Sequence, residues 1–318
     1  MSAPDVIVTA PLPPFLYDPL KRDFRTHDYY QSAEKPALLA AESPRIRGLV
    51  QGGGTVTPTT LLDALPKLEI ISVFGVGYDG VPIDYCRKRG IKVTNTPDVL
   101  TDDVADVAVG LVLMTGRGFA KAERFTRAGD WEKKGFELTT KLGGRKVGIL
   151  GLGRIGKAIA QRLESMGMQI AYTGRKAQPG VHYRFVPDLK TLAAESDFLV
   201  VACPGGPVTK NMVNAEVLTA LGKKGTIVNI ARGSIIDEAA LVKALESGTI
   251  KAAGLDVFAD EPHVPAPLLT MDNVVLLPHV GSATAETRKA MGDLCKANLD
   301  AWFGGKGTLT LIPELAAR

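Results

Sequence analysis

The chain has 318 residues, of which 45% are apolar and 23% charged, and its formal net charge is +4. This length exceeds one ordinary core and fits two domains, and the composition is that of a folded α/β protein rather than a disordered or fibrous one. Because the 38 basic residues are spread along the chain without dense runs, we expect neither a nucleic-acid nor a membrane partner.

Cysteine usage points to a reducing compartment. The chain has three widely spaced cysteines, Cys86, Cys203 and Cys295. An odd number at such spacing predicts neither a disulfide framework nor a metal-ligand cluster, so we expect no metal and a cytoplasmic protein. The apolar segment 104–114 is shorter than the roughly 20 residues that span a bilayer. Because it is apolar on most faces, it could pack between subunits, and we expect a homodimer.

Apolar, β-branched runs recur along the chain. In the first hundred residues they lie at 5–9, 46–51, 69–74 and 91–94. From residue 146 they lie at 146–150, 169–173, 197–201, 226–231, 252–257 and 273–277, and helix-like stretches such as 154–167 and 237–247 separate them. This alternation predicts two doubly wound parallel sheets. A helix over 284–303 and a short apolar tail, 309–315, follow; the pattern alone does not say which surface covers the tail.

A glycine-rich turn joins the strand at 146–150 to the helix at 154–167. Its sequence is GLGRIG, and we expect it to bind a dinucleotide through Gly151, Gly153, Arg154, Ile155 and Gly156. In this setting the first glycine permits the tight turn, the second lets the backbone approach a pyrophosphate, and the third allows close helix–strand packing. The flanking strand and helix disfavour the alternative of a purely structural turn.

The next strand predicts which dinucleotide is preferred. An NAD site usually ends this strand with Asp or Glu, which binds the ribose 2′-hydroxyl. Here Gly174 occupies the place of the acid, and Arg175 and Lys176 follow it. These cations can donate hydrogen bonds to a 2′-phosphate, so we predict NADPH, with NADH used more weakly. The alternative is that both cations merely decorate a surface loop.

Five motifs resemble those of the D-isomer-specific 2-hydroxyacid dehydrogenases. They are FGVGYD (74–79), VTNTP (93–97), NIARG (229–233), GLDVF (254–258) leading to Glu261, and LPHVGS (277–282). The resemblance covers nearly the whole chain, and YTGR (172–175) is most similar to the glyoxylate/hydroxypyruvate reductases. It implies a Rossmann cofactor domain, residues 98–285, inserted in a flavodoxin-like substrate domain, residues 1–97 and 286–318.

Arg232, Glu261 and His279 are the predicted catalytic residues. Arg232 can donate to the carboxylate of a 2-oxo acid and polarise its ketone. His279 can supply the proton that the reduced oxygen takes up, and Glu261 is the candidate neighbour that favours the charged imidazole. Taken singly, each could be a core histidine or a member of a surface ion pair; the ordered trio favours catalysis.

The resemblance implies further contacts by position. On the cofactor side these are Thr101, Cys203, Pro204, Thr209, Ile230, Ala231, Arg232, Asp256, His279, Gly281 and Ser282. On the substrate side they are Gly53, Val76, Gly77, Arg232 and His279. Asp256 would lie near the nicotinamide amide, and the N–H groups of Val76 and Gly77 would hold the substrate carboxylate. The loop after Pro204 has two glycines where many relatives have Leu-Thr, which leaves the placing of Cys203 and Thr209 open.

The implied activity is the reduction of glyoxylate or hydroxypyruvate to the D-2-hydroxy acid with hydride from NADPH. Two alternatives remain at this point. A nucleotide-sensing binding protein of the corepressor kind could keep the whole fold, although the chain lacks long disordered extensions and retains the trio. A dehydrogenase for another 2-hydroxy acid would differ only in the shape of its substrate pocket.

Overall fold

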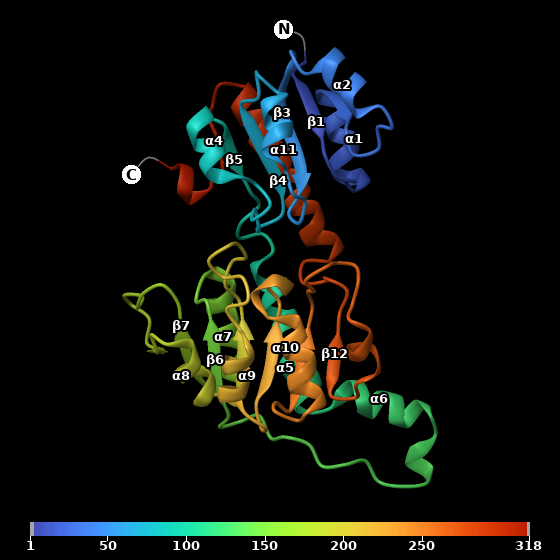
Figure 1. The fold of residues 1–318 in the computed structure, drawn as a ribbon, viewed down its shortest axis with the longest axis vertical. Coiled ribbons are helices and arrows are strands. Elements are labelled where there is room, and N and C mark those ends of the chain that lie inside the picture. Colours follow the sequence, from blue (N-terminus) through green and yellow to red (C-terminus); the bar gives the residue numbers. More distant parts are fainter. Residues whose placement is uncertain (1–2, 317–318) are drawn as a thin grey trace. The chain divides into compact units, whose positions relative to one another are not determined.

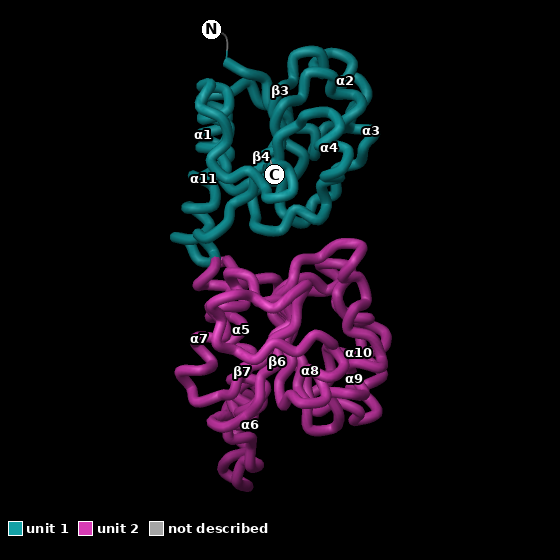
Figure 2. Tube along the Cα trace, turned by 90° about the vertical axis from the view of Figure 1, so that its left-hand side faces the viewer, with its two compact units in different colours: residues 1–100, 284–318 teal, residues 101–283 magenta. Residues whose placement is uncertain are grey.

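The chain folds into two compact units, coloured separately in Figure 2. The computed structural model describes residues 3–316. Unit 1 comprises Met1–Leu100 and Thr284–Arg318, and unit 2 comprises Thr101–Ala283. The domain boundaries predicted after residues 97 and 285 therefore lie within three residues of the boundaries between the units.

Unit 1 is built on a five-stranded parallel sheet of order β2-β1-β3-β4-β5. Its strands are β1 (Asp5–Val8), β2 (Arg25–Asp28), β3 (Ile46–Gly52), β4 (Ile70–Phe74) and β5 (Lys92–Thr94). Its helices are α1 (Pro14–Asp23), α2 (Lys35–Glu42), α3 (Thr59–Asp63), α4 (Ile83–Arg89) and α11 (Ala285–Phe303). Helices α1 and α11 pack against each other on one face of the sheet, and α2, α3 and α4 lie on the other (Figure 2).

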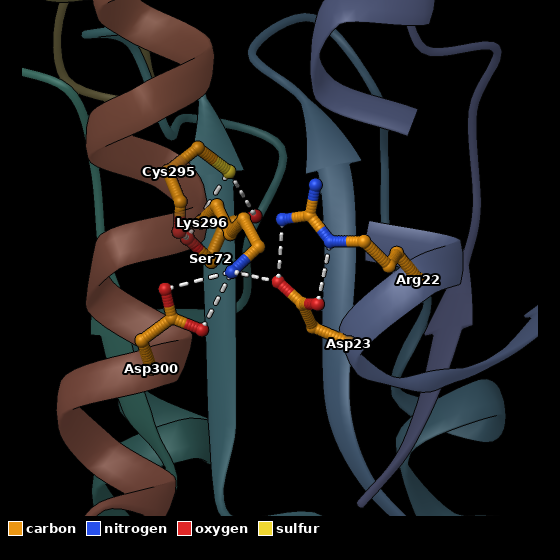
Figure 3. Close-up of polar contacts among 6 residues, drawn as sticks. All are labelled: Arg22, Asp23, Ser72, Cys295, Lys296 and Asp300. Atoms are coloured by element: carbon orange, nitrogen blue, oxygen red, sulfur yellow. Dashed lines mark hydrogen bonds and ion pairs between the residues drawn. The ribbon is translucent and has the colours of Figure 1, made fainter. Parts of the chain in front are cut away.

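Polar contacts attach helix α11 to the rest of unit 1, one of them a buried hydrogen bond and the others partly exposed ion pairs (Figure 3). The Ser72 hydroxyl, on β4, donates to the carbonyl of Cys295 at 2.8 Å. The ammonium of the next residue, Lys296, lies 2.8 Å from both Asp23, at the end of α1, and Asp300. The helix thus joins β4 and α1 from a position more than 200 residues later in the chain.

The apolar tail returns to unit 1 and completes its core. Leu311 forms an antiparallel bridge with Thr94, and the Ile312 N–H donates to the Val93 carbonyl at 3.0 Å. The Ile312 side chain is fully buried, and the short helix η4 (Pro313–Leu315) follows it. The surface that the sequence pattern could not identify is therefore the edge of β5.

Unit 2 is built on a seven-stranded parallel sheet of order β12-β11-β10-β9-β6-β7-β8. Its strands are β6 (Lys146–Leu150), β7 (Gln169–Thr173), β8 (Arg184–Phe185), β9 (Phe198–Val201), β10 (Thr226–Asn229), β11 (Ala252–Leu255) and β12 (Val274–Leu276). The chain runs outward from β6 to β8 and then crosses to β9, on the other side of β6. Ligands of such sheets bind at the carboxyl ends of the strands beside this reversal of order.

Helices cover both faces of the unit 2 sheet. Its helices are α5 (Thr101–Gly116), α6 (Phe119–Arg127), α7 (Arg154–Ser165), α8 (Leu189–Ala194), α9 (Ala215–Leu221) and α10 (Glu238–Glu246), with the short helices η1 (Asp130–Glu132), η2 (Gly233–Ile235) and η3 (Ala266–Thr270). Helices α5 and α7 pack together on one face, and α8, α9 and α10 lie on the other (Figure 2). Every residue of β9, β10 and β11 is buried, as expected for parallel strands covered on both sides. The predicted pair of parallel-sheet domains is confirmed.

A segment between α5 and β6 projects from unit 2 (Figure 1). We call residues 117–141, which include α6 and η1, the arm. All of its residues are described, and none is buried, although it carries apolar side chains such as Trp131 (69% exposed) and Leu138 (100% exposed). Among the described helices, none is both long and apolar enough to cross a membrane.

Candidate active site

The predicted residues of unit 2 gather at the carboxyl edge of its sheet. The glycine turn follows β6, Gly174 follows β7, and Cys203 follows β9. Arg232, Asp256 and His279 follow β10, β11 and β12. Because these strands are parallel and adjacent, their following loops open on one edge.

The three glycines of the turn after β6 have different local surroundings. Gly151 has a φ of +96°, and a Cβ there would lie 2.6 Å from Cα of Cys203. A Cβ on Gly156 would lie 2.2 Å from the Gly151 carbonyl oxygen. A Cβ on Gly153, in contrast, would meet nothing within 4 Å. The first and third glycines are therefore required by packing, whereas the second leaves open space in front of α7.

The start of α7 also differs from the starts of the helices on the opposite face. Side chains of Asp188, Asn214 and Asp237 cap α8, α9 and α10 by accepting N–H groups of the first turn. At α7 the N-cap residue is Gly153, and no side chain caps the helix. Uncapped N–H groups and the positive end of the helix dipole attract an anion. Together with the space at Gly153, they fit a dinucleotide pyrophosphate.

The loop after β7 presents cations and no carboxylate. Gly174, Arg175 and Lys176 are exposed, and a Cβ on Gly174 would meet nothing within 4 Å. The β7 backbone is close to the glycine turn, because the Gly151 N–H donates to the Thr173 carbonyl at 2.9 Å. The positions that would meet a ribose 2′-group and a pyrophosphate thus belong to neighbouring strand ends.

Arg232 lies in a turn that Asn229 holds. The buried Asn229 amide donates to the Arg232 carbonyl at 2.9 Å and accepts the Ala231 N–H at 3.0 Å. Gly233 packs so closely on the next loop that a Cβ there would lie 1.9 Å from the carbonyl carbon of Phe258. This turn therefore places the half-buried Arg232 beside the loop that carries Glu261.

Glu261 and His279 form a direct pair. Nδ1 of His279 lies 2.7 Å from Oε2 of Glu261, and Oε1 of Glu261 accepts the Phe258 N–H at 3.1 Å. Burial alone would raise the pKa of Glu261, but hydrogen bonding and the charges of His279 and Arg232 bring this pKa below its ordinary value. The carboxylate is thus ionised at neutral pH and accepts a hydrogen bond from the N–H of Nδ1. The other ring nitrogen of His279, Nε2, is left to face a substrate.

Asp256 fixes the turn that carries His279. Its backbone carbonyl accepts the N–H of His279 at 2.9 Å, and its two carboxylate oxygens accept those of Val280 and Gly281 at 2.7 and 2.8 Å. His279 has a φ of +53°, which residues other than glycine seldom adopt. Burial raises the pKa of Asp256. Three consecutive N–H groups bonded to one residue hold this unusual backbone conformation.

Other residues predicted to contact the cofactor lie at the same edge and differ in burial and in hydrogen bonding. Thr101 begins α5, Ile230 is buried, and Ala231 and Ser282 are half-buried. Thr209 donates its hydroxyl to the Pro204 carbonyl at 2.8 Å, which closes the loop after β9 on itself. Cys203 is buried against Gly151, and burial raises the pKa of its thiol to about 11.

Gly53, Val76 and Gly77 come together in unit 1. A Cβ on Gly53 would lie 3.1 Å from the Gly77 carbonyl oxygen, and the Gly53 N–H donates to the Phe74 carbonyl at 3.1 Å. Asn95 donates to the Val76 carbonyl at 2.9 Å and steadies this loop. Within residues 3–316, the N–H groups of Val76 and Gly77 donate to no other residue of the chain. They remain available as paired donors.

A group with metal-ligand chemistry lies apart from this edge, in unit 1. Asp5, His27 and Glu42 bring their ligand atoms within 4.8 Å of one another. Arg45 is paired with Glu42 and lies 3.8 Å from Asp5. Arg45 thus offers one positive charge to the two carboxylates, and the group is an ion-pair network.

The sequence did not predict the contacts of Asn229 and Asn95 or the hydrogen bonds of Asp256. Both asparagines stand in the quoted motifs, so their positions could have marked them as candidates. Their partners could not be identified, because these are backbone groups whose positions depend on the folded loops.

Comparisons with known proteins agree with this geometry. A model of the family described as D-isomer specific 2-hydroxyacid dehydrogenase, NAD binding domain, matches residues 109–281. The chain is 46% identical to the hydroxyphenylpyruvate reductase of Plectranthus scutellarioides and 46% identical to glyoxylate/hydroxypyruvate reductase A of Arabidopsis thaliana. Each alignment covers 98% of this chain and 100% of the relative.

Among solved structures, the NADPH-dependent glyoxylate/hydroxypyruvate reductase of Sinorhizobium meliloti, in complex with NADP and malonate, superposes with a TM-score of 0.92. It is 46% identical, and the match covers 100% of this chain and 99% of that one. The full-length similarity and the matching site motifs agree. The chain belongs to the D-isomer specific 2-hydroxyacid dehydrogenase family.

Proposed function

We propose that this protein reduces a small 2-oxo acid, glyoxylate or hydroxypyruvate, to the D-2-hydroxy acid with NADPH. The observation that carries the proposal is the 2.7 Å pair of His279 and Glu261, on the sheet edge that also bears the glycine turn. A proton donor and a dinucleotide cradle on one edge are what the reduction of a ketone requires.

The cofactor residues follow from the cradle. The N–H groups at the start of α7 would bind the pyrophosphate, with Gly153 leaving room for it. Arg175 and Lys176 would bind the 2′-phosphate, where no carboxylate opposes it. NADPH supplies the hydride when bound.

The chain's own residues would bind the substrate and supply its proton. In unit 2, Arg232 would donate to the carboxylate of the substrate and polarise its ketone. In unit 1, the paired N–H groups of Val76 and Gly77 are the proposed donors to a substrate carboxylate. His279 gives the proton on Nε2 to the carbonyl oxygen as negative charge develops there. Glu261, bonded to Nδ1, orients the ring so that Nε2 can face the substrate.

Steady-state kinetics with a panel of 2-oxo acids tests the reaction and the substrate separately. We expect kcat/KM to be highest with glyoxylate or hydroxypyruvate, and higher with NADPH than with NADH. Because one relative is a hydroxyphenylpyruvate reductase, hydroxyphenylpyruvate belongs in the panel. A higher kcat/KM for that acid would contradict the substrate and leave the reaction class intact. No turnover of any 2-oxo acid would contradict the reaction and favour a binding protein, which the reductase relatives do not support.

We further propose a cytoplasmic homodimer. The three cysteines are free and buried, as expected in a reducing compartment. The arm exposes Trp131 and Leu138 and buries none of its residues in its own chain, and a Cβ on Gly110 of α5 would meet nothing within 4 Å. A second copy could cover these surfaces by a two-fold contact.

Light scattering coupled to size exclusion tests the assembly. We expect twice the mass of one chain for the wild type and a shift toward monomer for the double variant Trp131→Ala, Leu138→Ala. Leu269→Ala removes an exposed leucine outside the arm and is the matched control. A monomeric wild type would contradict the proposal.

A further inference from the structure

The loop after β7 is tied down at its far end by two hydrogen bonds. The Gln178 backbone N–H donates to the hydroxyl of Tyr172 at 2.8 Å, and the Gln178 side-chain amide donates to the Leu152 carbonyl at 2.6 Å. Leu152 lies between Gly151 and Gly153, in the turn that would hold the pyrophosphate. One glutamine thus links this loop to the dinucleotide cradle.

Tyr172, which accepts the hydrogen bond from the Gln178 N–H, is firmly held in the structure. It is the penultimate residue of β7 and is 2% exposed, and its ring packs against Phe185 of β8 with centroids 5.4 Å apart. Its backbone carbonyl accepts the Val186 N–H at 2.8 Å. Because the ring is buried and packs against Phe185, its hydroxyl is a well-positioned acceptor for Gln178.

The residues between the two anchors are the cationic ones. Gly174, Arg175, Lys176 and Ala177 are all exposed, and the chain leaves the sheet at Thr173 and is fastened again at Gln178. Ordering such a segment on binding costs conformational entropy, roughly in proportion to the residues that become fixed. A segment closed at both ends has already lost much of that freedom before a ligand arrives.

We propose that Gln178 and Tyr172 are positioning residues that hold Arg175 and Lys176 for a 2′-phosphate and so set the preference for NADPH over NADH. The inference rests on the proposed NADPH preference and assigns its structural origin. Neither residue needs to contact the cofactor. We expect their effect to fall on the 2′-phosphate, because the close packing of Gly151 and Gly156 holds the glycine turn without Gln178.

Calorimetric titration of the full chain with 2′,5′-ADP and with 5′-AMP isolates the 2′-phosphate, because the two ligands differ in that group alone. We expect the wild type to bind 2′,5′-ADP more tightly than 5′-AMP. Gln178→Ala and Tyr172→Phe should each weaken the binding of 2′,5′-ADP roughly three- to tenfold, the scale of one hydrogen bond, and leave that of 5′-AMP unchanged. Gln169→Ala, an exposed glutamine at the other end of β7, should change neither.

A double-variant cycle distinguishes positioning from a general loss of structure. If Gln178 acts through the two cations, Gln178→Ala should no longer alter the ratio of the two affinities once Arg175→Ala and Lys176→Ala are both present. Equal weakening of both ligands, or no weakening by either variant, would overturn the positioning role while the wild-type preference stands. A wild type without preference for 2′,5′-ADP would overturn the NADPH proposal as well.

Discussion

The carboxyl edge of the unit 2 sheet is built in two ways. At the end of β6, which we call the glycine half, the site consists of backbone and of space where side chains are missing. At the ends of β10, β11 and β12, the charged half, it consists of ionisable side chains held by hydrogen bonds. In the glycine half, a Cβ at Gly151 would collide with Cys203. In the charged half, hydrogen bonds hold the side chains or the turns that carry them.

The difference shows what each kind of site demands of a sequence. A backbone site needs glycines at fixed spacing, so the spacing itself predicts it. A side-chain site needs the right residue and also the neighbours that orient it, and those neighbours come from other strands. Substitutions in the two halves should therefore differ in their effects on stability, cofactor binding and kcat.

The largest effect is expected for His279→Ala in the charged half. Removing the proton donor should lower kcat by about 10²- to 10⁴-fold. NADPH binding, measured by fluorescence titration, should persist, because the glycine half is untouched. His263→Ala, whose side chain is 79% exposed, is the matched control and should behave as the wild type. Near-normal turnover of His279→Ala would refute its role.

In the glycine half, Gly151→Ala and Gly153→Ala should differ. At Gly151 the added Cβ meets Cys203 and the φ is +96°, so we expect the free energy of unfolding to fall by about 2–5 kcal/mol. At Gly153 the Cβ enters open space, so stability should be retained while KM for NADPH rises. Thermal melts and kinetics measure both. Unchanged NADPH affinity in Gly153→Ala would mean that the space does not receive the pyrophosphate.

Asp256→Asn tests how tightly the charged half is held. The amide can accept only one of the two N–H groups of Val280 and Gly281, and its own NH₂ would face the other. We expect a loss of about 1–3 kcal/mol in the free energy of unfolding, with a lower kcat because the turn of His279 loosens. Asp260→Asn, on the exposed loop nearby, is the control. Wild-type stability and kcat in Asp256→Asn would contradict this account.

The smallest expected effect is the pH dependence from Glu261. Its pKa is lowered in the folded chain, so the unfolded chain binds its proton at a higher pH. The stabilisation is therefore present above the unfolded pKa, about 4.3, and is lost as pH falls through the lower folded value. Because the side chain is 35% exposed, we expect less than about 1 kcal/mol. Other carboxylates, such as Glu69, also have a lowered pKa, so urea unfolding between pH 3 and 7 should show a decline in both proteins that is smaller in Glu261→Gln than in the wild type.

The sequence predicted the elements with strong local patterns. The glycine turn, the strands at the centre of each sheet and helix α11 were all predicted near their observed bounds. Strands β2 and β8 were missed, because Arg25–Asp28 is polar and Arg184–Phe185 has only two residues. Both are edge strands, which need apolar alternation less than central strands do.

Within the site, the residues that carry charge could be predicted and their supports could not. Arg232, Glu261 and His279 stand in motifs whose order is visible in one dimension. The hydrogen bond between Gln178 and Leu152 joins residues 26 positions apart, and the one between Asp256 and Gly281 joins residues 25 positions apart. In each pair one partner is a backbone group. Every residue has such groups, so no side-chain type marks these partners in the sequence.

Helix α11 has a consequence for the order in which the chain can fold during synthesis. Ser72 of β4 and Cys295 of α11 are 223 positions apart, and the whole of unit 2 lies between them. Unit 2 is continuous, so all of its strands have been translated before α11 exists. Until then, the face of β4 that α11 covers has no partner. Translation therefore favours a folded unit 2 first, with unit 1 completed last by α11 and the tail that follows it.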